Sequence, residues 1–117
     1  FKYRCFFHFF NNQTPLHIAA QCGSTEFASA LINFGAELDV QDYQGDTPLH
    51  LAMANCKYGT AKVLLKNGAD PFVRNNAGQT PEYSAPLSHS NQAKAFFRNW
   101  DDWDEMKDAL EFREKDI

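Results

Sequence analysis

The sequence predicts an all-α repeat solenoid built from helix-turn-helix units that are joined by hairpin-like loops. The first observation behind this prediction is the tetrapeptide Thr-Pro-Leu-His, which occurs at residues 14–17 and again at residues 47–50. The second is a partial copy, Thr-Pro-Glu-Tyr at residues 80–83, which keeps the same interval of 33 residues. A unit of this length cannot bury its apolar face alone and stacks on its neighbours, which is typical of a solenoid.

Other positions keep the same interval, so the repeat does not rest on the tetrapeptide alone. The further matching pairs are Gly35 and Gly68, Ala36 and Ala69, Glu37 and Asp70, Gly45 and Gly78, and residues 31–32 and 64–65. Since glycines, apolar residues and acidic residues all recur at one step, the whole unit is repeated.

Each unit is expected to begin with a short helix at its Thr-Pro pair. The threonine hydroxyl can accept a hydrogen bond from a free backbone N–H group, and proline suits the first helical position. Apolar residues then recur at helical spacing. The pattern predicts that these helices end near residues 22–23 and 55–56.

A second helix is predicted over residues 25–34 in the first unit and 58–67 in the second, again from apolar periodicity. Gly35 and Gly68 follow, as is typical of a left-handed residue just past a helix end. The connector at residues 36–46 is rich in Asp, Gln and Gly and is expected to form a hairpin-like turn.

The third unit departs from the other two. Glu82 and Tyr83 replace the leucine and the histidine, and Pro86 lies where the first helix is expected, which should shorten or distort that helix. Polar replacements of this kind are typical of a terminal repeat whose outer face meets water. A second helix is predicted at residues 91–99, with three inward residues: Ala93, Phe96 and Phe97.

Residues 101–117 carry most of the acidity of the chain. They hold eight acidic and three basic residues, whereas the whole chain has a net charge of −4. Trp103, Met106 and Leu110 are spaced to share one face, so the segment is predicted to form an acidic amphipathic helix that caps the last repeat. The alternative is a partner-binding or partly free acidic helix.

Residues 1–12 are atypical for the start of such an array. In register, residues 5–12 take the place of a polar hairpin, but they hold four phenylalanines, Phe6, Phe7, Phe9 and Phe10. Such a run left in water favours association. We expect either an irregular cap over the first repeat or a docking segment that contacts another chain. A longer protein with an earlier repeat is a third possibility.

Two stretches of the chain carry a family resemblance. The text QTPLHIAAQCG with LINFGAELDVQD, followed by DTPLHLAMANC with VLLKNGADPFVRN, resembles the ankyrin repeat. The resemblance extends over about residues 11–100 and implies antiparallel helix pairs, joined by projecting hairpins, in a slightly curved L-shaped array. We therefore place the ankyrin-type repeats at residues 13–100, between the two atypical ends.

The composition of the chain makes some classes of protein less expected than others. The negative net charge argues against nucleic acid, which needs a basic face. No run approaches the roughly 20 apolar residues of a membrane helix, and the aromatic start has no cleavage site of a signal peptide. Three cysteines without close pairing predict reduced thiols and a cytoplasmic or nuclear location.

The residues that could carry chemistry form no reactive constellation. The resemblance implies that His17 and His50 are structural, each bonding to the Thr of its motif and to neighbouring backbone. Cys22 and Cys56 lack zinc-ligand spacing, and no glycine-rich loop precedes a helix. We therefore expect no enzyme activity and no cofactor, and we assign no catalytic, cofactor-binding or metal-binding residue.

The resemblance implies instead a protein-binding surface on the hairpin tips and on the exposed side of the first helices. Carried over position by position, the candidates are Gln21, Gln41, Tyr43, Gln44, Asp46, Asn55, Arg74, Asn76 and Gln79, with Ala54 and Leu87 beside them. We expect a non-enzymatic protein–protein interaction module. The alternative is a structural or assembly element that self-associates or docks in a larger protein through its Phe-rich start.

Overall fold

The computed structural model describes residues 12–99 of the chain, and every regular element in this range is helical. The elements are α1 (Pro15–Cys22), α2 (Thr25–Asn33), α3 (Pro48–Ala54), α4 (Tyr58–Lys66), the 3₁₀ turns η2 (Pro81–Ser84) and η3 (Leu87–His89), and α5 (Ser90–Asn99). This composition confirms the predicted all-α solenoid. The predicted N-terminal segment, apart from Asn12, and the predicted acidic C-terminal helix lie outside the described residues.

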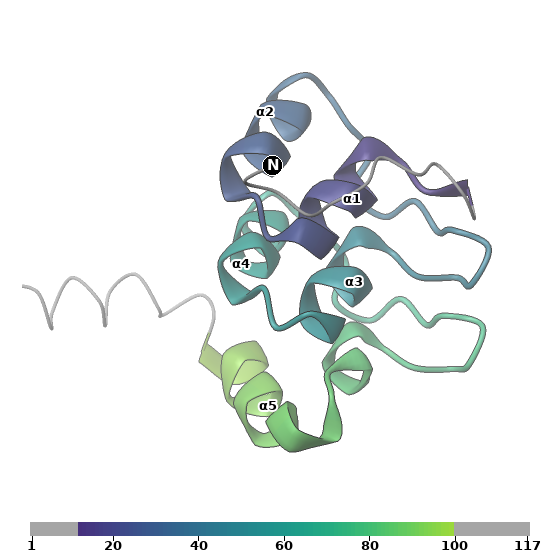
Figure 1. The fold of residues 1–117 in the computed structure, drawn as a ribbon, viewed down its shortest axis with the longest axis vertical. Coiled ribbons are helices and arrows are strands. Elements are labelled where there is room, and N and C mark those ends of the chain that lie inside the picture. Colours follow the sequence, from purple (N-terminus) through teal and green to yellow (C-terminus); the bar gives the residue numbers. More distant parts are fainter. Residues whose placement is uncertain (1–11, 100–117) are drawn as a thin grey trace, which may run out of the picture.

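The helices form two rows (Figure 1). One row contains α1, α3 and η2, and the other contains α2, α4 and α5; neighbours contact one another both along the rows and across them. The loops at residues 34–47 and 67–80 project from the same side of the stack. This arrangement sets the loop tips beside each other and beside the first row of helices.

The Thr-Pro pairs start α1 and α3 as predicted. The hydroxyl groups of Thr14 and Thr47 accept the backbone N–H groups of His17 and His50, each at 3.4 Å, and a proline occupies the first turn. Because an N-cap hydroxyl satisfies one of the orphan N–H groups of a helix start, each cap contributes about 1 kcal/mol. The same four residues therefore build the same helix start twice.

The second helices end one residue before the predicted positions, at Asn33 and Lys66. Gly35 and Gly68 follow with φ values of 91° and 101°, which confirms the predicted left-handed residue past each helix end. Each helix therefore stops where a residue without a Cβ atom allows the chain to turn into the loop.

The first helix of the third unit is reduced to η2, four residues of 3₁₀ helix. Pro86 is extended, with a ψ angle of 148°, because its ring restricts the backbone and it cannot donate to a preceding turn. The chain then enters η3 and α5, whose residues Ala93 and Phe96 are 0% and 4% exposed. The predicted distortion and the predicted inward face of the last helix are both confirmed.

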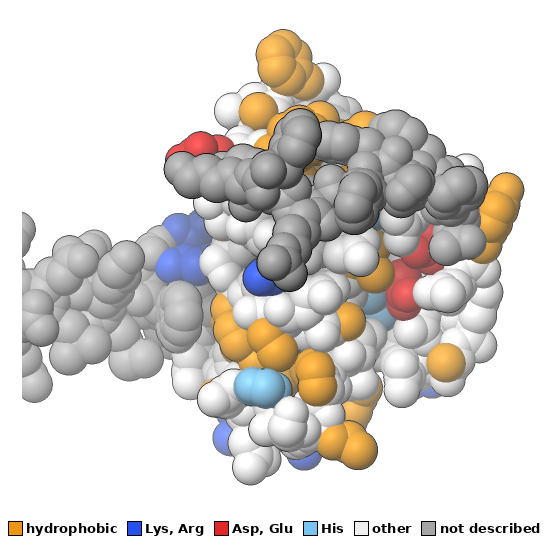
Figure 2. All heavy atoms as spheres, viewed as in Figure 1, with side chains coloured by type: hydrophobic (Ala, Val, Ile, Leu, Met, Phe, Trp, Pro, Cys, Tyr) orange, Lys and Arg blue, Asp and Glu red, His pale blue; other side chains and the backbone are white. Residues whose placement is uncertain are grey.

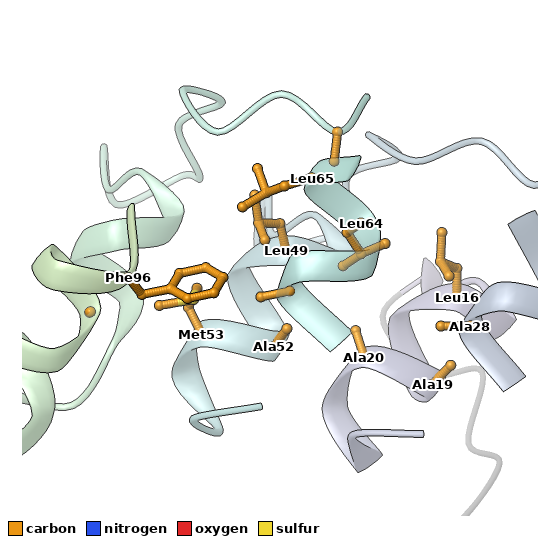
Figure 3. Packing of buried hydrophobic residues seen from close by; sticks show 13 residues of the cluster. Leu16, Ala19, Ala20, Ala28, Leu49, Ala52, Met53, Leu64, Leu65 and Phe96 are labelled. Carbon is orange, nitrogen blue, oxygen red and sulfur yellow. The ribbon is translucent and has the colours of Figure 1, made fainter. Parts of the chain in front are cut away.

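The core runs through all three units as one cluster (Figure 3). Leu49 and Met53 of the central α3 are fully buried, and Phe96 of α5 points toward Met53. Small residues at the contact of α1 with α3, including Ala20 and Ala52, are also fully buried and allow the two backbones to approach closely. Burial of one leucine or methionine side chain stabilises the fold by about 1.5–3 kcal/mol.

Among residues 12–99, no helix has the length and the apolar character that crossing a membrane requires.

Candidate protein-binding surface

The motif histidines are held by hydrogen bonds at both ring nitrogens. His17 Nδ1 accepts the backbone N–H of Thr14 at 3.1 Å, and Nε2 lies 2.8 Å from the carbonyl oxygen of Asp46 in the next loop. His50 repeats this pattern with Thr47, at 3.1 Å, and Gln79, at 2.9 Å. Both rings are almost fully buried, so they join a helix start to the following loop, as the sequence indicated.

These contacts define a neutral imidazole. Because Nδ1 of His17 accepts from an N–H group, its proton lies on Nε2, which donates to the Asp46 carbonyl. Burial lowers the pKa of His17 below its ordinary value of 6.5. The Asp46 carbonyl and the carboxylates of Asp42 and Asp46 act in the opposite direction, but burial dominates.

Each loop is tightened by an Asp or Asn side chain that caps its own turn. Asp42 Oδ1 accepts the N–H groups of Gln44 and Asp46, both at 2.9 Å. Asn75, which is 33 residues later, accepts the N–H groups of Ala77 and Gln79 at 3.0 and 2.9 Å. Side chains of this type stabilise turns by bonding to backbone two residues on, so the loop tips have a defined shape.

Neighbouring loops are also bonded to each other, and three of the predicted partner-binding residues take part through their side chains. The side-chain bonds run from Gln41 Nε2 to the Arg74 carbonyl (3.1 Å), from Asn76 Nδ2 to the Tyr43 carbonyl (2.8 Å), and from Asn75 Nδ2 to Asp46 Oδ1 (2.9 Å). The polar groups of Gln41, Asp46 and Asn76 are therefore engaged inside the scaffold. Their first role in this structure is to hold the loops in register.

Asn55 is engaged within its own helix, because its Nδ2 donates to the Leu51 carbonyl at 2.8 Å. The remaining predicted residues are exposed: Gln21, Tyr43, Gln44, Arg74 and Gln79. Tyr43 is 72% exposed although it is aromatic, and Arg74 lies on the adjacent loop. Of the nine candidates only Asp46 is half-buried and the others are exposed, but the side chains of Gln41, Asp46, Asn55 and Asn76 are already engaged in hydrogen bonds within the chain.

Several large apolar side chains are also exposed. Leu87, at the position of the concave helix face that the repeat assigns to it, is 93% exposed, and Tyr83 is 63% exposed. Phe34 and Phe72, at 91% and 78%, were not predicted. The sequence offered one signal for them, because the equivalent positions of the other unit are polar. Phe34 corresponds to Asn67, and Phe72 corresponds to Asp39. Exposed aromatic groups of this size are candidates for contact with other molecules.

The two cysteines among the described residues differ in their covalent state. Cys22 is disulfide-bonded, whereas Cys56 is a free thiol, so the expectation of reduced thiols is wrong for Cys22. Within residues 12–99, no cluster of three or more His, Cys, Asp or Glu residues could hold a metal ion.

Among the described residues, one pocket lies on the first unit and another lies between α4 and α5. One, of about 300 Å³, is lined by residues of α1, α2 and the first loop: Thr14, Pro15, Leu16, Leu31, Ala36, Glu37 and Val40. The other, of about 350 Å³, is lined by Tyr58 of α4 and by Gln92, Ala95, Phe96 and Asn99 of α5. Both linings are mainly apolar, and neither brings catalytic groups together.

The arrangement of helix pairs, capped Thr-Pro starts and bonded loops defines a repeat protein of the ankyrin class. A family model for ankyrin repeats in three copies matches residues 4–75. The match spans more than half of the chain, and the protein belongs to the ankyrin repeat family. It ends before Thr80, where the altered third unit begins. No curated protein matches the chain.

Proposed function

We propose that this chain binds a partner protein along the loop tips and the concave helix face, without covalent chemistry. Members of the ankyrin repeat family are generally protein–protein interaction modules. Support for the site comes from one observation: Tyr43 and Arg74 are exposed on adjacent loops whose backbones are linked by the Gln41 and Asn76 side chains. A rigid platform loses little conformational entropy when it binds, which favours affinity.

The side chains that would anchor a partner are the exposed Tyr43 and Arg74. Tyrosine and arginine dominate the energetics of protein interfaces because each combines a large contact area with directional hydrogen bonding. Leu87 adds an apolar contact on the first-helix row of the third unit. Gln41 and Asn76 support these anchors indirectly, because their side chains hold the loop backbones in position.

A double substitution tests this site. Tyr43→Ala with Arg74→Ala is expected to weaken partner binding by about 2 kcal/mol or more, which is roughly 30-fold. The partner is identified by affinity capture from native cell extract with quantitative mass spectrometry, and the affinity is then measured by calorimetry. Lys94→Ala with Arg98→Ala, on exposed positions of α5, is the matched control and should leave binding unchanged. Equal losses in both double variants would place the interface elsewhere.

Assembly through the Phe-rich start is a separate proposal. The face of the first unit that bears the 300 Å³ pocket is less covered than its counterpart in the second unit. Pro15 is exposed whereas Pro48 is buried, and Leu31 is half-buried whereas Leu64 is fully buried. Light scattering tests it: a concentration-dependent dimer that Phe9→Ser with Phe10→Ser abolishes would support assembly, and a monomer at all concentrations would exclude it.

A cytoplasmic or nuclear location stays a prediction.

A further inference from the structure

The pocket between α4 and α5 has an aromatic floor. Phe96 is 4% exposed, and its ring centroid lies 5.3 Å from that of Tyr58 and 5.4 Å from that of Phe97. The hydroxyl group of Tyr58 is buried next to Cys56. Burial, followed by the neighbouring Cys56, raises the pKa of Tyr58. The pocket lining therefore combines the aromatic rings of Tyr58 and Phe96 with the polar side chains of Gln92 and Asn99.

A basic ridge leads away from this pocket along α4. Tyr58, Lys62 and Lys66 follow one another at intervals of four residues, so they lie along one face of the helix. Figure 2 shows basic side chains gathered on the flank of the molecule that carries α4. The ridge and the pocket belong to the second row of helices, away from the projecting loops.

The other two basic residues near this end lie on a different face. The pocket takes Gln92, Ala95, Phe96 and Asn99 from α5, which share one side of that helix. Lys94 and Arg98 are exposed and are not part of the lining. Of these two pairs of basic side chains, only Lys62 and Lys66 on α4 continue the line of the pocket.

The C-terminal segment of this chain has the composition that fits this surface. Residues 101–117 have a net charge of −5, from eight acidic and three basic residues, and include the apolar side chains of Trp103, Met106 and Leu110. The segment also begins at the right place, because Asn99 lines the pocket and only Trp100 separates the two.

The length of the segment is sufficient as well. Seventeen residues in helical form would extend about 26 Å, whereas the nine residues of α4 extend about 14 Å. Opposite charges steer and orient such a contact, and apolar side chains supply the buried area.

We propose that residues 101–117 dock in cis on this surface, with an apolar side chain in the pocket of Tyr58 and Phe96 and with acidic side chains along Lys62 and Lys66. The docked segment occupies a site for acidic amphipathic peptides that is separate from the loop tips, so an acidic segment of another protein would have to displace it.

Tryptophan fluorescence of the full chain tests this proposal, because the only two tryptophans are Trp100 and Trp103. At low salt the unmodified chain should show blue-shifted emission and slow acrylamide quenching. Lys62→Glu with Lys66→Glu should shift the emission to longer wavelength and raise the quenching constant about twofold, and raising the salt from about 0.01 M to about 1 M should act in the same direction. Lys94→Glu with Arg98→Glu is the matched control and should quench like the unmodified chain.

A charge swap adds a rescue. Asp104→Lys with Asp108→Lys, combined with Lys62→Glu and Lys66→Glu, should restore slow quenching at low salt. Circular dichroism verifies that each variant is folded. The salt series on the unmodified chain tests the proposal without any substitution. Docking in cis would be overturned by solvent-exposed tryptophans in the unmodified chain or by equal quenching in the α4 and α5 double variants. It would also be overturned by protection that disappears on dilution, because this indicates docking between chains.

Discussion

His17 shows how one side chain can join two units of the stack. Its Nδ1 atom is tied to Thr14 at the start of its own helix, and its Nε2 atom is tied to Asp46 in the following loop. A change of protonation would remove the acceptor at Nδ1 while Thr14 still presents its N–H group there. The neutral ring is therefore part of the folded state, and acid acts on the fold through this residue.

Lowering the pH is expected to destabilise the protein through His17. Its pKa is lowered by folding from an ordinary 6.5, so the unfolded chain binds the proton first as the pH falls. The contribution of His17 to the free energy of unfolding is complete above pH 6.5 and decreases as the pH falls from 6.5 to the lowered pKa of the folded state. For one proton the decrease is at most about 1.4 kcal/mol per pH unit. Urea unfolding across this range measures the slope, and His17→Gln should be less stable but flatter. An unchanged slope in the variant would contradict the prediction.

Cys56 occupies a backbone conformation that suits glycine better. It has a φ angle of 57°, and the equivalent residue of the first unit is Gly23, with a φ angle of 75°. A side chain in this region costs about 1–2 kcal/mol, partly offset by the greater freedom of glycine in the unfolded chain. Cys56→Gly should therefore raise the free energy of unfolding by about 0.5–1 kcal/mol.

The control for that substitution is Cys56→Ala, which removes the thiol but keeps the Cβ atom. Chemical denaturation of the three proteins separates the two effects. If the alanine variant gains as much stability as the glycine variant, the thiol rather than the backbone conformation is responsible.

At the scale of the element, the helix starts were predictable because their cause is local. Thr14 caps a helix that begins at Pro15, and all the interacting groups lie within four residues. The distortion at Pro86 was predictable for the same reason, since the restriction belongs to the proline ring. Local chemistry repeated at a fixed interval was sufficient to predict the order and type of the helices.

The roles of the loop residues could not be predicted in the same way. Gln41 looks like any exposed polar residue of a turn, and its bond to the Arg74 carbonyl exists only because the next loop stacks beside it. Asp46 likewise accepts from Asn75, which is 29 residues away. The sequence indicated where the candidate surface lies, but the division between scaffold and solvent-facing side chains depends on packing between units.

The loops offer a matched pair of glycines that measures this packing. Gly45 and Gly78 have the same φ angle of 79°, but a Cβ atom on Gly45 would lie 2.6 Å from the backbone nitrogen of Asn76, whereas Gly78 has open space. Gly78→Ala should cost about 1–2 kcal/mol from strain alone. Gly45→Ala should cost more, because the two loops must also move apart, and urea denaturation of both variants compares them. Equal costs would show that the loops do not constrain each other.

At the scale of the molecule, residues 12–99 form a short stack in which the central unit has two neighbours. Met53 and Leu49 of α3 are fully buried by units on both sides, while the end units each have one described neighbour. In repeat proteins, stability is approximately the sum of unit terms and nearest-neighbour terms. A stack this short places most of its interface energy around α3, so it should unfold as one cooperative unit.

The same leucine of the motif, truncated in two units, tests that view. Leu16 and Leu49 are 1% and 0% exposed, and truncation of a buried leucine to alanine costs about 2.7–5 kcal/mol depending on how far the site collapses. Leu49→Ala should fall near the upper end, because contacts to both neighbours hold its cavity open. Leu16→Ala should fall near the lower end, because its unit can relax toward the 300 Å³ pocket. Urea unfolding followed by circular dichroism gives both values, and hydrogen exchange tests cooperativity. If Leu16→Ala proves the more costly change, or if exchange shows the first unit opening alone in the Leu49→Ala variant, the stack is not a single cooperative unit centred on α3.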